Sequence, residues 1–226
     1  MANYFISDLH FIDMEASAGY QNASILTWER TQFKDKYEHN NFLLDKFEQW
    51  AHKLKDGDNF YVLGDWGDPF YLSSAMFPFT RKDIHTVFVA GNHDKIKDRE
   101  KFEIWFDEVH WYPFNLNERL IISHFPQAIW PGQVNVCGHL HGMKLNNPGY
   151  ICCSINDTDY NLISDKHING AFSKIPKMDT HFLEEPWADM YQVTKRDTED
   201  LIVRADNTVD ISATKAYRKM LEKFDK

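Results

Sequence analysis

The sequence predicts an α/β fold, in which strands and helices alternate along the chain. Three observations support it: short apolar runs recur along the first two thirds of the chain, a helix-like pattern separates the first two runs, and a second such pattern follows the third run directly. The order strand, helix, strand, helix is typical of layered α/β folds. With 226 residues, 43% of them hydrophobic, the chain can bury a large core and fits one domain with an appendage better than two full domains.

Six short, mainly apolar runs are bounded by turn residues or polar motifs, as expected for buried strands. They lie at residues 4–6, 60–63, 87–89, 120–122, 134–136 and 150–153. A further strand-like run lies near the end of the chain, at 201–203.

Three segments have the apolar spacing of helices. Residues 40–54 form the first, with Asn40 or Asn41 available as N-cap, and residues 97–109 form the second. The third is an amphipathic segment at 212–224. Residues 11–39 show no clean periodicity, and because a loop of that length is usually functional, it is a candidate wall for a ligand pocket.

Charge and cysteine content exclude several classes of protein. The net charge of −9 argues against a broad basic surface, so we expect no extended nucleic-acid interface. The chain has no apolar run long enough to span a bilayer and no signal-like N-terminus, which predicts a cytoplasmic protein without a membrane partner. The three cysteines lie in apolar runs and are expected to be buried, reduced thiols. Nothing in the sequence indicates the oligomeric state.

Potential metal ligands follow five of the predicted strands directly. The five motifs are Ser7-Asp8-Leu9-His10, Gly64-Asp65-Trp66-Gly67-Asp68, Gly91-Asn92-His93-Asp94, Ser123-His124 and Gly138-His139-Leu140-His141-Gly142. In open α/β sheets, the loops beyond the carboxyl ends of the strands converge on one crevice, where ligands bind. We therefore expect these side chains to lie together.

The types of these side chains favour a pair of divalent metal ions. Imidazole, carboxylate and amide oxygen without thiolate suit Mn, Fe, Zn or Ni, with Mn preferred and Mg also allowed. The seven candidates are too many for one catalytic ion with an open position. Two ions roughly 3.5–4 Å apart can share a hydroxide and hold a phosphoryl group. The candidates are Asp8, His10, Asp65, Asn92, His124, His139 and His141.

With these motifs in this order, the chain resembles the calcineurin-like metallophosphoesterase superfamily. That family carries Asp-x-His, Gly-Asp-x-x-Asp, Gly-Asn-His-Asp, an isolated His and Gly-His-x-His, and the resemblance covers roughly residues 3–155. The opening Ser7-Asp8-Leu9-His10-Phe11 is most similar to bacterial and phage members. The resemblance implies a four-layer αββα sandwich of two mixed sheets. We expect a catalytic core at residues 1–165 and a C-terminal extension, residues 166–226, packed on it.

The resemblance also implies a role for each motif residue. One metal would be held by Asp8, His10 and His141, and the other by Asn92, His124 and His139. Asp65 would bridge the two metals. His93 would face the substrate, stabilise the phosphoryl oxygens and protonate the leaving group as a general acid. Asp68 would orient the His93 ring, and together these two form the predicted catalytic pair.

The predicted activity is hydrolysis of a small phosphoester or nucleotide-type substrate, with a phosphodiester preferred. Protein phosphatases of the same superfamily place arginines after the second motif and before Gly-Asn-His, where they clamp a dianionic monoester. Here Pro69 and Phe70 follow Asp68, and Ala90 precedes Gly91. A phosphomonoesterase, a nuclease with the same metals and a non-catalytic scaffold remain alternatives.

Several polar or aromatic residues have both a functional and a structural interpretation. Arg30 and Lys95 are candidates for contact with a substrate phosphate, although most such residues are simply solvated. Trp66 is a candidate for stacking on a substrate ring or for packing. Asp94 is more often a turn former or helix N-cap. Six histidines outside the motifs are expected on the surface or as satisfied core groups: His39, His52, His85, His110, His167 and His181.

Overall fold

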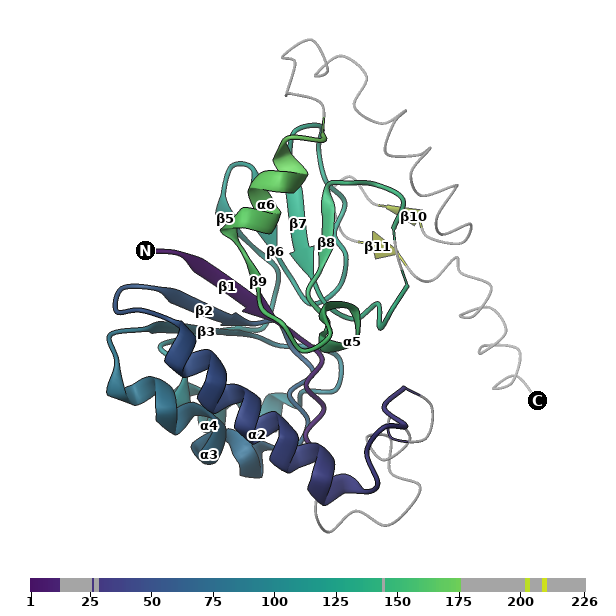
Figure 1. Cartoon of the computed structure of the whole chain (residues 1–226). Coiled ribbons are helices and arrows are strands. Elements are labelled where there is room, and N and C mark those ends of the chain that lie inside the picture. The colour runs from purple at the N-terminus through teal and green to yellow at the C-terminus, as the bar shows by residue number, and fades with distance from the viewer. Residues whose placement is uncertain (13–25, 27–28, 144, 176–201, 204–208, 211–226) are drawn as a thin grey trace, which may run out of the picture.

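The computed structural model describes residues 1–12, 26, 29–143, 145–175, 202–203 and 209–210 (Figure 1). Its strands are β1 (Asn3–Ile6), β2 (Asn59–Val62), β3 (His85–Val89), β4 (Glu108–His110), β5 (Phe114–Asn117), β6 (Leu120–Ile122), β7 (Val134–Cys137), β8 (Tyr150–Cys152), β9 (Ile163–Ser164), β10 (Ile202–Val203) and β11 (Val209–Asp210). Its α-helices are α2 (Lys36–Lys53), α3 (Leu72–Met76), α4 (Arg99–Trp105), α5 (Ile155–Thr158) and α6 (Asp165–Phe172). Three short 3-10 helices cover Pro69–Tyr71, Phe77–Arg81 and Ile96–Asp98.

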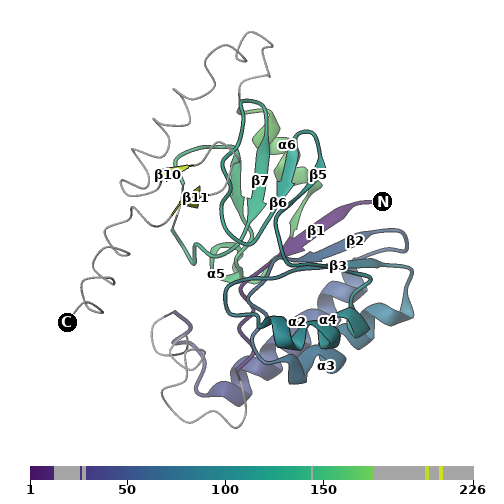
Figure 2. The same cartoon turned by 180° about the vertical axis from the view of Figure 1, so that it is seen from behind.

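The strands form two mixed sheets (Figure 2). The first has the order β4-β3-β2-β1-β9, in which β1 to β4 are parallel and β9 is antiparallel to β1. The second has the order β5-β6-β7-β8, in which β6 to β8 are parallel and β5 is antiparallel to β6. The pair β10 and β11 forms a separate antiparallel ribbon.

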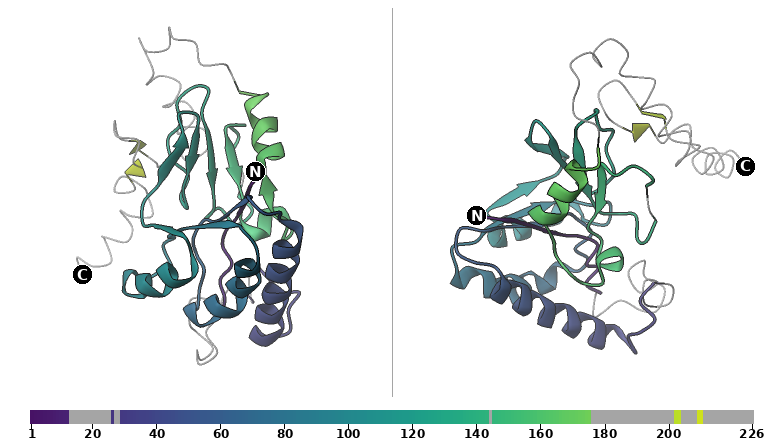
Figure 3. Two further views of the ribbon diagram at one scale, coloured as in Figure 1. Left: turned by 90° about the vertical axis from the view of Figure 1, so that its left-hand side faces the viewer. Right: turned by 45° about the horizontal axis from the view of Figure 1, so that its top comes forward.

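Both faces of the first sheet are apolar. Side chains alternate between the two faces along each strand, and each face packs in its own core cluster. On one face, Phe60 and Phe88 pack in a core cluster beneath α2, α3 and α4. On the other face, Tyr61 and Val87 pack in a second cluster with residues of the second sheet, such as Val136. Figure 3 shows the three helices on one side of the first sheet and the second sheet on the other, while α6 packs against β7 and β8. The prediction of an α/β fold with two mixed sheets and flanking helices is confirmed.

The predicted start of the first helix was wrong. Helix α2 begins at Lys36, and its N-cap is Asp35, whose carboxylate accepts the backbone N–H groups of Tyr37 and Glu38. Asn40 instead lies inside the helix and points into the protein. Its side chain accepts the N–H of Ile12 and donates to the carbonyl of the same residue, at 3.0 and 2.8 Å. The apolar pattern misses the first turn of α2 because its one buried residue, His39, is polar.

Other elements differ from the prediction at their ends. The second helix ends at Trp105, and Val109 belongs to strand β4. Strands β4, β5 and β9 were not predicted, because they are short and carry polar side chains; β5 alternates half-buried and exposed residues. The strand-like run at 201–203 contains β10, whereas the helix expected at 212–224 lies outside the described residues.

The first residues of the expected C-terminal extension form most of α6, which packs on the second sheet. Most of the remaining extension lies outside the described part of the chain, as do residues 13–25 and 27–28 of the long loop. The division into a core and an extension therefore stays a prediction. Among the helices described, none is long and apolar enough to cross a membrane.

Candidate metal centre

The first two ligand motifs lie side by side because backbone pairing continues past the ends of β1 and β2. The N–H of Asp8 donates to the carbonyl of Gly64 at 3.0 Å, and the N–H of His10 donates to the carbonyl of Asp65 at 2.9 Å. Phe11 and Trp66 extend the pairing by one further bond, of 2.7 Å. These bonds place the Asp8 and His10 loop directly against the Asp65 loop.

Left-handed backbone is concentrated in the candidate ligands. Five of them have positive φ, and they account for five of the seven non-glycine residues with positive φ in the described part of the chain. Each such residue costs about 1 kcal/mol or more and persists only where the surrounding structure holds it. The five are Asp8 (59°), His10 (51°), Asp65 (51°), His139 (69°) and His141 (42°). Strain of this kind, gathered where strands of both sheets end, is typical of a functional site.

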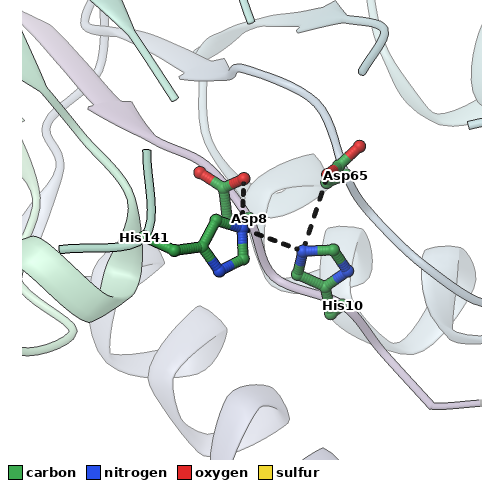
Figure 4. Close-up of side chains that lie close together, drawn as sticks. All are labelled: Asp8, His10, Asp65 and His141. Carbon is green, nitrogen blue, oxygen red and sulfur yellow. Dashed lines mark hydrogen bonds and ion pairs between the residues drawn. The ribbon is translucent and has the colours of Figure 1, made fainter. Parts of the chain in front are cut away.

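Four candidate ligands form a first cluster (Figure 4). His141 Nε2 lies 3.0 Å from Asp8 Oδ1 and 3.3 Å from His10 Nε2, and His10 Nε2 lies 3.5 Å from Asp65 Oδ2. One ligand atom from each of the four residues lies within 4.8 Å of the others.

A second cluster lies on the other side of Asp65. His124 Nε2 is 3.5 Å from Asp65 Oδ2 and 2.9 Å from Asn92 Oδ1. The same Asn92 oxygen is 3.1 Å from His139 Nδ1. Ligand atoms of Asp65, His124 and His139 lie within 4.8 Å of one another. All seven candidates are thus brought together, divided as the family resemblance implies, and the role of each as a ligand stays a prediction.

The donor atoms of both clusters fit divalent cations. Two imidazole Nε2 atoms face each other at 3.3 Å in the first cluster, and the carboxylates of Asp8 and Asp65 flank them. A cation between such groups would take the place of the His141 Nε2 proton and accept a lone pair from each of the four residues. Nitrogen and oxygen donors without thiolate are the set expected for Mn, Fe, Zn or Ni.

The ionisable groups of the clusters influence one another strongly. Burial raises the pKa of Asp65 to about 6, and the charge of Asp8 adds to this. Burial would also raise the pKa of Asp8, but the hydrogen bond from His141 and nearby imidazoles hold it well below its usual range. Burial and the charge of Arg30 lower the pKa of His10 far below its ordinary value. His10 is therefore neutral, the form in which imidazole binds a metal.

Asp94 joins the loop after β2 to the loop after β3. Its carboxylate accepts three backbone N–H groups, those of Asp65 at 2.8 Å, Trp66 at 3.0 Å and Gly91 at 2.7 Å. Gly91 is needed at this junction because a Cβ there would collide with the side chain and the backbone nitrogen of Asp65. Asp94 is thus more than a turn former, and it fixes the position of Asp65.

We expect Asp94→Ala to lower the free energy of unfolding by at least about 2 kcal/mol, because three inward-facing N–H groups lose their acceptor. Urea unfolding at equilibrium measures this loss. Glu103→Ala is the matched control: Glu103 pairs at 2.6 Å with Arg99, and the two side chains are 42% and 53% exposed, so we expect a change below about 1 kcal/mol. Equal losses in the two variants would contradict the role given to Asp94.

Of the two predicted catalytic residues, His93 lies beside the ligand clusters and Asp68 lies at the start of the 3-10 helix Pro69–Tyr71. The backbone N–H of His93 donates to Asp65 Oδ1 at 2.9 Å, and its ring Nε2 lies 3.9 Å from Asp65 Oδ2. The His93 side chain is 30% exposed, so its ring is open to a substrate. Asp68 caps the 3-10 helix that follows it by accepting the N–H of Phe70 at 3.0 Å. The proposed action of Asp68 on His93 stays a prediction.

The sequence did not indicate Glu29, suggested a substrate contact for Arg30 that the structure excludes, and left two interpretations of Trp66 open. Glu29 lies within hydrogen-bonding distance of His141 Nδ1, and no pattern in the sequence indicated it. Arg30 is buried and bonded to the backbone carbonyls of Asp8 and Leu9, so it does not reach a substrate phosphate. Trp66 is fully buried among core aromatic rings, which excludes stacking on a substrate ring.

Strands of two mixed sheets end at two clusters of aspartate and histidine that could hold metal ions. The family model of calcineurin-like phosphoesterases matches residues 3–221, and the chain belongs to this family. The match extends well beyond the expected residues 3–155. The chain is therefore a metal-dependent phosphoester hydrolase, whereas its assignment to a bacterial or phage subclass stays a prediction. No curated protein matched the chain.

Proposed function

We propose that this protein is a phosphodiesterase that uses two divalent ions, preferably manganese, to hydrolyse a small nucleotide-type diester. The observation that carries the proposal is that the two ligand clusters meet at one carboxylate oxygen. Asp65 Oδ2 lies 3.5 Å from His10 on one side and 3.5 Å from His124 on the other. A shared carboxylate is the arrangement that a dinuclear centre needs.

In this proposal, Asp65 bridges two sites of similar composition. The first ion is held by Asp8, His10 and His141, and the second by Asn92, His124 and His139. Two ions bound there would lower the pKa of a water molecule to near neutrality and neutralise charge on the phosphoryl oxygens. The protein contributes the spacing, because backbone pairing and Asp94 fix both loops that flank Asp65.

His93 is the residue placed to act on the substrate. Its backbone is fixed by the bond to Asp65 Oδ1, and its ring lies beside the shared carboxylate with part of its surface exposed. The ring would donate a hydrogen bond to a phosphoryl oxygen, and then transfer that proton to the oxygen of the departing alkoxide. Bond cleavage would thus release a neutral alcohol.

The preference for a diester rests on which arginines could contact the phosphoryl group. The two arginines that clamp a dianionic monoester in related protein phosphatases are replaced here by Pro69 and Ala90. Arg30 does not substitute for them, because its terminal nitrogens are bonded to backbone carbonyls and its side chain is buried. A diester has one fewer negative charge to neutralise than a fully ionised monoester.

We expect the purified protein with manganese to hydrolyse bis(p-nitrophenyl) phosphate with a kcat/KM at least about tenfold above that for p-nitrophenyl phosphate, or about 1.4 kcal/mol. Both substrates release the same phenolate, so the ratio reports on the number of phosphoryl charges. A ratio below one would favour the phosphomonoesterase. Inactivity toward both with two metals bound would favour the non-catalytic scaffold.

A panel of natural diesters would then identify the substrate class. It would contain cyclic nucleotides, dinucleotides, capped nucleotides, and single- and double-stranded polymers, all with manganese. We expect the small diesters to be cleaved and the polymers to be left intact, because the net charge of −9 does not favour an extended polyanion. Preferential nicking of the polymers would contradict this and favour the nuclease.

A further inference from the structure

We propose that Glu29 and Arg30 act together as positioning residues for one half of the metal centre, the half formed by Asp8, His10 and His141. This inference rests on the proposed dinuclear centre and deepens it. The two adjacent residues come from the long loop before α2, yet they contact ligand segments from two distant parts of the chain.

Arg30 holds the backbone that carries the first two ligands. Its side chain is 1% exposed, and its NH1 group donates to the carbonyl of Leu9 at 2.6 Å. Its NH2 group donates to the carbonyl of Asp8 and, at 3.1 Å, to Asn156 Oδ1. A planar guanidinium with several N–H groups suits two successive carbonyls, which a lysine ammonium would not match.

The contacts of Arg30 fall where the backbone is strained. Asp8 and His10 both have left-handed φ, and Leu9 lies between them. Such a conformation persists only if neighbouring groups hold it, and the two carbonyls bonded to Arg30 belong to this segment. Arg30 thus determines the direction in which the side chains of Asp8 and His10 leave the backbone.

Helix α2 provides further polar contacts to Arg30 through His39 and Asn40. NH1 of Arg30 lies 2.7 Å from His39 Nε2, and His39 Nδ1 lies 3.0 Å from Asn40 Oδ1. Asn40 is bonded to both backbone groups of Ile12, just past the ligand segment. Burial and the charge of Arg30 lower the pKa of His39 to about 3, so this ring is neutral and can accept the bond from Arg30. A buried polar network therefore connects α2 to residues 8–12.

Glu29 orients the third ligand of the same half-site. Its Oε2 atom accepts a hydrogen bond from His141 Nδ1 and lies 3.3 Å from Asn156 Nδ2. A proton kept on Nδ1 by Glu29 leaves Nε2 as the ring nitrogen that can exchange its proton, which it otherwise shares with Asp8 Oδ1, for a metal ion. A carboxylate behind a metal-binding histidine commonly fixes its tautomer and orientation in this way, and its loss weakens metal binding about 10- to 100-fold.

The described contacts of Glu29 and Arg30 reach the first half-site and none of Asn92, His124 or His139. A purely structural role would predict equal effects on both sites or on neither. A positioning role predicts selective loss of one metal. This difference makes the inference testable without measuring catalysis.

The experiment titrates metal-free protein with Mn²⁺ by calorimetry, and measures bound metal and thermal unfolding. We expect Glu29→Ala to weaken one of two equivalents about 10- to 100-fold and to leave the other and the unfolding temperature of the metal-free protein unchanged. Glu29→Gln retains an acceptor for His141 Nδ1, so we expect it to restore most of the affinity. Glu29 is 37% exposed on its side chain, which makes these variants tolerable for folding.

Arg30→Lys and Arg30→Met extend the test to the buried residue. We expect both to weaken the same equivalent, and Arg30→Met also to lower the unfolding temperature. Arg119→Met is the matched control, because Arg119 is exposed and its Nε donates to a single carbonyl, that of Gly132, at 3.0 Å. It should leave both equivalents as in the wild type.

Equal weakening of both equivalents, or wild-type binding in Glu29→Ala, would overturn the positioning role. These outcomes are distinct from failure of the proposed function. Wild-type protein that binds two equivalents but cleaves no diester would refute the phosphodiesterase and leave the positioning role intact.

Discussion

Asp65→Asn is expected to remove both metals, lowering the metal content from about two equivalents to well below one. The reason is that Asp65 Oδ2 faces both clusters at 3.5 Å, so the change removes one negative charge from two sites at once. We expect kcat/KM for a diester to fall by at least about two orders of magnitude, or roughly 3 kcal/mol of transition-state stabilisation. Elemental analysis after gel filtration measures the metal, and initial rates measure the activity.

The asparagine is nearly isosteric and can still accept the N–H of His93 through Oδ1, so the fold should be retained. Asp98→Asn serves as the control, because Asp98 pairs with Lys101 away from the clusters. If Asp65→Asn lost only one equivalent, the two half-sites would not share this carboxylate. Activity that survives removal of all metal with a chelator would contradict the metal-dependent chemistry as a whole.

The ligand motifs could be found from the sequence because each directly follows a buried strand. In β1, β2 and β3, the apolar run and the polar motif after it are continuous, so the strand indicates where the motif lies. Parallel neighbours then bring these strand ends to one edge. The Asp8 and Asp65 motifs could therefore be placed together from the sequence.

The residues that hold the ligands in place could not be found in the same way. Arg30 and Glu29 lie in a stretch without periodicity, and a charged residue there is usually solvated. Their importance comes from tertiary contacts with Leu9 and His141, which no local pattern encodes. Asp94 was misjudged for a related reason, since its three N–H partners come from two different loops.

The wrong start of α2 and the missed strand β4 also have physical causes. Helix α2 begins at Lys36, three residues before its first buried residue, the polar His39, and the cap at Asp35 stabilises this first turn. Strand β4 carries Glu108 and His110, whose side chains pair with each other at its surface. Polar edge strands of this kind lack the apolar pattern from which strands are predicted.

His93→Ala is expected to retain both metal equivalents and to lower turnover of a natural diester by two or more orders of magnitude. His93 lies beside the clusters without belonging to either, since its Nε2 is 3.9 Å from Asp65 Oδ2 and its backbone makes the bond to Asp65 Oδ1. Alanine preserves that backbone bond and removes only the ring. Metal content and kcat, measured on the same preparation, separate the two effects.

The leaving group provides the sharper test of this role. A nitrophenolate departs without protonation, whereas the alkoxide of a nucleoside needs a proton, so a general acid matters far more for the second. We therefore expect His93→Ala to slow a nucleoside diester at least about tenfold more than bis(p-nitrophenyl) phosphate. His110→Ala is the control, since His110 stacks on Phe114 and pairs with Glu108 outside the clusters. Equal losses on both substrates would leave His93 as a residue that binds the phosphoryl group and would exclude it as the proton donor.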